Sequence, residues 1–251
     1  MSIQNVMSLV GGLGNITAIK TPDCMYYCKF QDGDKYLWGF LSPSDPRLET
    51  VLVREEVSIE QHQQLLSGGN IVYYDGEVFN ADSNQYYLDE NGDFVKRSDE
   101  EYHQIIATQR KEELIQYLYS LKANRAYGGV IVNGAVKFET NQTSITNTVA
   151  SIALMRDTDK THWKFYTLND EPIMLEISKL QLYAVAQFGK DMIDACFAVE
   201  GEYIANLRKA SVENLINEQW VEQFKTAAQN AMNEVNINIE VDFTESNQTG
   251  N

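Results

Sequence analysis

The sequence predicts an α+β protein in which a small β-rich module precedes long helices and further hairpins. Short alternating segments joined by turn residues fill the first part of the chain, as is typical of hairpins. A long amphipathic segment follows, and hairpin and helix patterns then alternate towards the C-terminus. We expect four regions: a β-rich N-terminal module (1–97), a connecting helix (98–126), a hairpin-helix-hairpin-helix α+β domain (127–210), and a C-terminal helix and strand (211–251).

Three turn signals between strand-like segments predict the N-terminal module. The segments CMYYCKF and KYLWGFL flank QDGD, the segment NIVYYDGEVFN contains Asp-Gly, and QYYLDENGDFVKR contains Asn91-Gly92. Between them, Ser58 is a suitable N-cap for a short helix. Leu65 and Leu66 form the expected apolar face of this helix, and Gly68 ends it.

The connecting helix is predicted from its caps and its apolar spacing. Ser98 is a suitable N-cap, acidic residues follow it, and Lys122 and Arg125 lie near the negative end of the helix dipole. One face carries Ile106, Arg110, Leu114, Leu118 and Leu121. This stripe is short for a coiled coil, so we favour packing within the chain over a seam between copies.

The segment YGGVIVNGAVKFETNQTS, which begins the third region, is rich in glycine. Gly129 and Gly134 have the spacing of a P-loop, but Ala135 and Val136 stand where a P-loop has lysine and serine or threonine. A hairpin explains the segment better, because a β-branched run leads into Asn133-Gly134, a favoured pair for a type I′ turn. We therefore expect no nucleotide cofactor at this position.

The rest of the third region alternates helix, hairpin and helix. A helix capped by Thr143 or Ser144 is expected to place Ile145, Val149 and Ile152 on one face. Strands over 163–167 and 173–177 form the next hairpin. A long helix then begins at Ser178, and Gly189 and Gly201 are interior glycines that could bend it.

The last region contains an amphipathic helix and an alternating strand. The helix covers SVENLINEQWVEQFKTAAQNAMNEV. The strand is expected in VNINIEVDF, where five apolar side chains alternate with polar ones. Burying these five side chains would contribute about 7 to 15 kcal/mol to its stability. Because the strand would not form in water, it must join a sheet in its own chain or in a neighbour. We predict a partner interface at these side chains: Val235, Ile237, Ile239, Val241 and Phe243.

Composition excludes several classes of partner. The 36 acidic and 20 basic residues give a net charge of −16, which argues against nucleic-acid binding and anionic membranes. No apolar run approaches the length of a membrane span, and the N-terminus lacks the basic region of a signal peptide. We therefore expect no membrane insertion and synthesis in a cytoplasm.

No residue pattern points to a catalytic, cofactor or metal site. Cys24 and Cys28 are near in sequence, but no second pair of ligands accompanies them, and buried free thiols explain them better. The acidic residues are numerous, and none is marked as a catalytic pair. Tyrosines that could form a sugar-binding platform are explained by strand propensity: Tyr73, Tyr74, Tyr86 and Tyr87. We expect no catalytic residue, no cofactor and no metal.

Residues 127–210 resemble a domain of unknown function that recurs in bacteriophage tail-fibre and tail-assembly proteins. The likeness rests on GGVIVNGAVKFETNQTSITNTVASIALM, WKFYTLNDEPIML and the following long helix. In that family a hairpin leads to an F-x-T-D/N step, a capped helix and a W-x-x-x-D/N-G hairpin. The matching residues are Phe138, Thr140, Asn141, Ser144, Trp163 and Asn169, whereas Asp170-Glu171 departs from the usual glycine.

A second likeness lies upstream, where VSIEQHQQLLSGGNIVYYDGEVF is similar to a module of tail-fibre assembly proteins. The two resemblances imply a structural component of a phage tail, at a baseplate, collar or fibre attachment point, that acts through protein-protein contacts with other tail proteins in an oligomeric or multi-subunit assembly. They leave open a tail-fibre assembly chaperone that is absent from the mature virion. The resemblance implies no catalytic residue, and it implies location in the virion tail after synthesis in the host cytoplasm.

Overall fold

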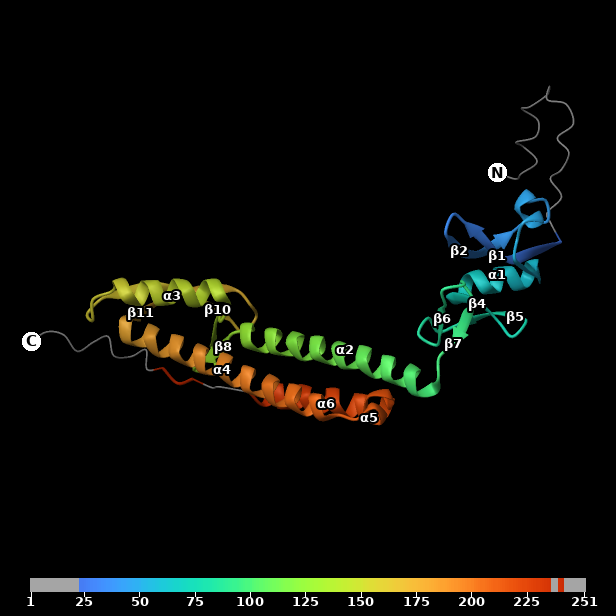
Figure 1. Cartoon of the computed structure of the whole chain (residues 1–251). Coiled ribbons are helices and arrows are strands. Elements are labelled where there is room, and N and C mark those ends of the chain that lie inside the picture. The colour runs from blue at the N-terminus through green and yellow to red at the C-terminus, as the bar shows by residue number, and fades with distance from the viewer. Residues whose placement is uncertain (1–22, 236–238, 242–251) are drawn as a thin grey trace, which may run out of the picture. The chain divides into compact units, whose positions relative to one another are not determined.

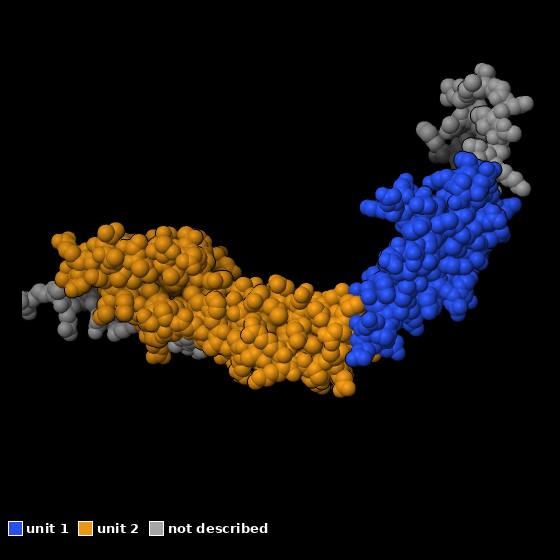
Figure 2. Space-filling model, viewed as in Figure 1, with its two compact units in different colours: residues 1–102 blue, residues 103–251 orange. Residues whose placement is uncertain are grey.

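The computed structural model describes residues 23–235 and 239–241, which form an α+β fold (Figure 1). Its contacts divide the chain into two compact units, residues 1–102 and residues 103–251 (Figure 2). The first unit is rich in strands, and the second contains the long helices and a four-stranded sheet. The predicted fold class is therefore confirmed.

Over its described residues, 23–102, the first unit contains three small sheets, a 3-10 helix, one short α-helix and the start of a long one. The sheets are β2-β1-β3, β4-β5 and β6-β7, and all their pairings are antiparallel. The elements are β1 (Cys24–Asp32), β2 (Lys35–Leu41), η3 (Pro46–Glu49), β3 (Val53–Ser58), α1 (Ile59–Gly68), β4 (Asn70–Tyr74), β5 (Glu77–Ala81), β6 (Tyr86–Leu88) and β7 (Phe94–Lys96).

Turn chemistry and aromatic packing hold the first unit together. Asp75 and Gly76 have positive φ angles of 53° and 83° and join β4 to β5, as the sequence predicts. The core contains Tyr27 and Trp38, whose rings stack at 5.4 Å. Leu65 of α1 is buried, but Leu66 is 61% exposed, so the predicted apolar face was wrong at that position. The helix presents only one of the two adjacent leucines to the core because neighbouring residues point in different directions.

The second unit combines long helices with the sheet β11-β10-β9-β8, whose neighbouring strands are antiparallel. Helix α2 begins at the end of the first unit and continues through the second. The elements are α2 (Asp99–Tyr127), β8 (Val130–Val132), β9 (Val136–Phe138), α3 (Gln142–Leu154), β10 (Lys160–Thr167), β11 (Pro172–Ser178), α4 (Lys179–Lys209), α5 (Val212–Ile216) and α6 (Glu218–Glu234).

One hydrophobic core joins the regions that the sequence separated at 126/127 and 210/211. Leu118 of α2, Met192 of α4 and Met232 of α6 are all buried in it. Arg110 of α2 also makes two hydrogen bonds to the carboxylate of Glu218 on α6. Helix α2 is therefore part of the second unit and not only a connection, because its apolar stripe packs within the chain. The prediction of intrachain packing is confirmed for this stripe.

Two predicted helix starts need correction. Asn141, and not Thr143 or Ser144, is the N-cap of α3, and its side chain accepts a hydrogen bond from the Ser144 N–H. The single C-terminal helix is divided, because Asn217 ends α5 and its side chain caps α6 by accepting from the Trp220 N–H. In both places asparagine side chains compete with the backbone for hydrogen bonds.

Thr140 follows β9 and is fully buried, and its side chain bridges the end of α2 and the residue before β8. Its hydroxyl donates to the Ala126 carbonyl at 2.5 Å and accepts from the Gly129 N–H at 3.1 Å. These contacts satisfy two backbone groups where the chain leaves the helix. Thr140 therefore both fills space in the core and satisfies the backbone at the end of α2.

Replacing Thr140 by valine should destabilise the protein by about 2 to 4 kcal/mol, because the same shape without the hydroxyl leaves both backbone groups unpaired. Thr140→Ser keeps the hydroxyl and removes one methyl group, so it should cost about 1 kcal/mol. Urea unfolding followed by circular dichroism would measure both. Equal costs for the two variants would show that packing, and not the hydrogen bonds, decides the effect.

Candidate functional site

The candidate site is an apolar groove between α3 and α4. Ser178 caps α4 through a capping box with Gln181, so the first turn of α4 begins directly after β11. Glu139 accepts hydrogen bonds from Ser144 and Asn141 at the start of α3. Burial opposes ionisation of this carboxyl, but hydrogen bonds from Ser144, Tyr166 and Asn141 outweigh it and lower its pKa. The starts of both helices are therefore fixed by side-chain hydrogen bonds.

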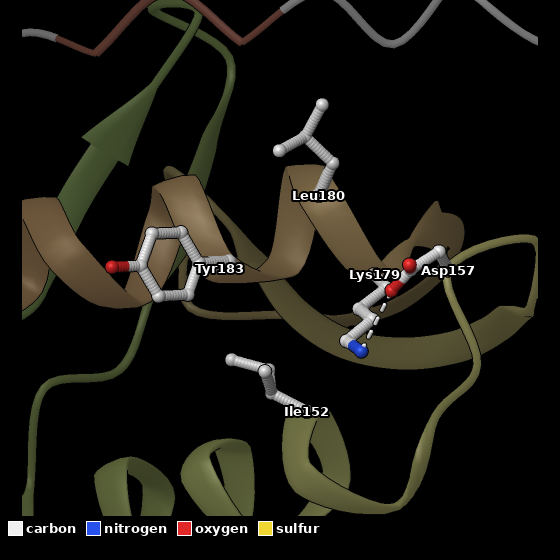
Figure 3. A pocket seen from close by; sticks show the side chains of 5 residues that line it. All are labelled: Ile152, Asp157, Lys179, Leu180 and Tyr183. Carbon is white, nitrogen blue, oxygen red and sulfur yellow. Dashed lines mark hydrogen bonds and ion pairs between the residues drawn. The ribbon is translucent and has the colours of Figure 1, made fainter.

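Two adjoining hollows form the groove. The first has a volume of about 310 Å³ and is lined by Ile152, Asp157, Lys179, Leu180 and Tyr183 (Figure 3). The second, of about 210 Å³, shares Ile152 and Tyr183 with the first and continues along both helices. Its other lining residues are Ile145, Val149, Ala186, Gln187 and Lys190.

Large apolar side chains at the groove are open to solvent. Val149 and Tyr183 are more than half exposed, and Leu180 is 71% exposed. Contiguous exposed apolar surface is typical of sites that bind other proteins or ligands. The arrangement can therefore bury apolar side chains of a partner.

The charged groups around the groove are already paired. Lys179 pairs with the Asp157 carboxylate, the interaction dashed in Figure 3, and its Nζ lies 2.9 Å from the nearest oxygen. Lys190 Nζ lies 2.5 Å from the carboxylate of Asp194. Both acidic partners are well exposed, so these are surface ion pairs of small energy. The groove thus offers apolar contact with charges balanced at its sides, and no feature of it resembles a nucleophile and base.

The structure describes three of the five predicted interface residues, and all three contact their own chain. Ile239 is 1% exposed and Val241 is 7% exposed, and both belong to the core of the second unit. Val235 ends α6 and packs against the same core. Ile237 and Phe243 lie outside the described residues. For Ile239 and Val241 the structure shows a contact within the chain, and a partner interface at these positions stays a prediction.

The three cysteines differ in burial. All three are free, and Cys28 and Cys196 are buried, whereas Cys24 is partly exposed. Burial raises the pKa of the Cys28 and Cys196 thiols. Among the described residues, no group of three or more His, Cys, Asp or Glu side chains could hold a metal ion. Within the same part of the chain, no helix has the length and apolar character to cross a membrane.

The tyrosines of the first unit take part in packing. Tyr73 stacks on Trp38 at 5.3 Å, and Tyr74 contacts the edge of Tyr86. Arg97 lies over the ring of Tyr87 at 4.5 Å. These contacts account for the aromatic residues of the strands without a ligand.

No protein-family model, curated protein or solved structure matches the chain. The groove must therefore be judged by its own chemistry. Sequence reasoning named Ile145, Val149 and Ile152 as one face of a helix but did not identify that face as part of a groove. It missed Leu180 and Tyr183, although both lie in the first turns of the helix that the Ser178 cap predicts.

Proposed function

We propose that the chain is a structural component of a bacteriophage tail, at a baseplate, collar or fibre attachment point, that acts through contacts with other tail proteins. The resemblance of residues 127–210 to a domain of phage tail proteins supports this proposal. The acidic composition, with a net charge of −16, suits protein partners better than nucleic acid. On this proposal the chain is made in the host cytoplasm and is carried in the virion.

The observation that carries the proposal is the open apolar groove between α3 and α4. It lies within the residues that carry the resemblance, and it exposes Val149, Leu180 and Tyr183 to solvent. Exposing apolar side chains of this size to water is unfavourable in free energy, and contact with apolar side chains of a partner would remove that surface from water. A structural protein needs such a surface, whereas an enzyme needs convergent polar groups.

The deciding experiment is quantitative mass spectrometry of gradient-purified virions beside the crude lysate. A fixed ratio of this chain to a known tail protein in the particles supports a structural role. Abundance in the lysate with absence from particles would instead support the assembly chaperone, which the upstream likeness of residues 57–79 favours. Absence of any association with tail proteins would contradict both.

The same experiment tests the groove. Val149→Asn and Leu180→Asn should reduce incorporation into particles at least about tenfold when combined, since each removes apolar area from a contact. Both side chains are exposed, so the free energy of unfolding should change by less than about 1 kcal/mol. Leu52→Asn, at an exposed leucine of the first unit, is the matched control and should leave incorporation unchanged. Normal incorporation of the groove variant would show that the contact with tail proteins does not involve the groove.

A further inference from the structure

Strand β8 is the edge of the four-stranded sheet, and the C-terminal segment 239–241 extends that edge. Ile239 forms a parallel bridge with Val132. The Ile239 N–H donates to the Ile131 carbonyl at 3.3 Å, and the Asn133 N–H donates to the Ile239 carbonyl at 2.6 Å. An extended segment thus satisfies backbone groups that an edge strand otherwise presents to its surroundings.

Asn133 holds the segment at a second point. Its side-chain amide donates to the Val241 carbonyl at 2.8 Å, and its side-chain oxygen accepts from the Val241 N–H at 2.7 Å. The same residue has a φ of 54° and forms the hairpin turn with Gly134. Asn133 therefore recognises the backbone of the segment, while its own backbone makes the turn.

Two side chains of the segment fill sites in the core. Ile239 and Val241 are 1% and 7% exposed, whereas Glu240 between them is exposed. The site therefore selects an extended segment with apolar, polar and apolar side chains in sequence. The hydrogen bonds supply attachment, and the two apolar sites supply selectivity.

We propose that the β8 edge with Asn133 also binds segment 239–241 of a second copy of this chain, so that neighbouring copies can be joined by strand exchange. The occupant follows from the structure, because every copy carries the segment that fits this site. Only three residues, 236–238, separate the segment in sequence from Val235, which packs on the core. Short connections favour such exchange.

The balance between the two arrangements follows from concentration. Exchange replaces a contact within one chain by the same contact between two chains, so it adds almost no new contact energy. A short connection gives an effective concentration of roughly millimolar for the contact within the chain. Dilute protein is thus closed, and exchange becomes populated where copies are held close together. This holds whether or not the chain is a tail component.

The test removes competition within the chain. A ¹⁵N-labelled donor carries Asn133→Gly, which weakens its own site, and a photoreactive benzoylphenylalanine in place of Glu240. An unlabelled acceptor carries Ile239→Ser and Val241→Ser, so its own segment fits its site poorly. After mixing and irradiation, mass spectrometry should find labelled peptides containing position 240 joined to unlabelled peptides of residues 130–138.

Asn133 of the acceptor decides the result. Asn133→Gly in the acceptor, which permits the positive φ, should lower the yield of mixed-label products at least about fivefold through loss of two hydrogen bonds. Asn133→Asp, which keeps the acceptor atom and loses the donor, is a second variant of the site. Asp75→Gly is the matched control, because Asp75 has a φ of 53° in the β4-β5 hairpin, and it should leave the yield unchanged.

Several outcomes would overturn strand exchange. These are an absence of mixed-label products, products at other positions of the acceptor, or a yield that is insensitive to both variants at Asn133. Circular dichroism of each chain checks that the comparison is made between folded proteins. If an Asn133 variant is unfolded, the position of the cross-link in the acceptor that retains Asn133 still decides.

Discussion

Replacing Lys122 by methionine should destabilise the second unit by about 3 to 5 kcal/mol. Lys122 Nζ lies 2.8 Å from Glu200 Oε1, and their side chains are only 17% and 9% exposed. That oxygen has no aligned hydrogen bond in the structure, so the lysine charge is what compensates it. Lys122 also lies over the Phe197 ring at 4.2 Å. Without it, a carboxylate between α2 and α4 would remain buried and uncompensated.

Urea unfolding followed by helical circular dichroism measures this loss, and two controls identify its cause. Lys122→Met combined with Glu200→Leu should recover most of the stability, because a buried ion pair contributes little beyond an apolar pair of similar size. Lys190→Met removes an equivalent partner on the surface of α4, where both side chains are about 60% exposed. It should cost less than about 1 kcal/mol. If Lys122→Met costs no more than Lys190→Met, the buried charge is not what the lysine compensates.

The sequence predicted those elements that are decided locally. Asn133-Gly134 and Asp75-Gly76 form hairpin turns with positive φ angles, and turn geometry of this kind depends on adjacent residues alone. The same holds for Ser58 and Ser178, whose side chains cap α1 and α4. Where neighbours in sequence supply both partners of an interaction, sequence is sufficient.

Long-range interactions could not be predicted in this way. Lys122 and Glu200 meet only because α2 and α4 pack together, and neither residue has a sequence neighbour that signals the pair. The expected strand over 235–243 was placed by alternation alone, but only Ile239 forms a bridge among its described residues. Alternation indicates that side chains are buried on one side and does not indicate which sheet edge receives them.

The groove shows the same limit. The apolar spacing of Ile145, Val149 and Ile152 predicts that they share one helix face, and on that face Val149 is 57% exposed. Spacing identifies a face but does not say whether another element of the chain covers it. Tyr183 and Leu180 begin a helix whose main face is occupied by the core, so they become part of an open surface instead.

Gly189 gives the second large prediction. The sequence suggested a bend at this position, but the structure gives Gly189 a packing role in α4. A Cβ atom placed there would lie 3.2 Å from Thr140 Cγ2, 3.5 Å from Ile145 Cδ1 and 3.6 Å from Phe138 Cε1. The missing side chain therefore lets α4 approach the residues around β9 and α3, and glycine at this position costs helix propensity in exchange for close contact.

Gly189→Leu should destabilise the protein by at least about 2 kcal/mol, because overpacking exceeds the gain of about 1 kcal/mol in helix propensity. Gly189→Ala should change stability little, since the Thr140 methyl group must move by only a few tenths of an ångström. Gly201 lies in the same helix with open space around it, so Gly201→Leu should stabilise by about 0.5 to 1 kcal/mol. Thermal and urea unfolding of the three variants would separate the cost of overpacking from the gain in helix propensity. Stabilisation by both leucines would mean that α4 does not pack closely at Gly189, whereas opposite signs within one helix can arise only from what each glycine faces.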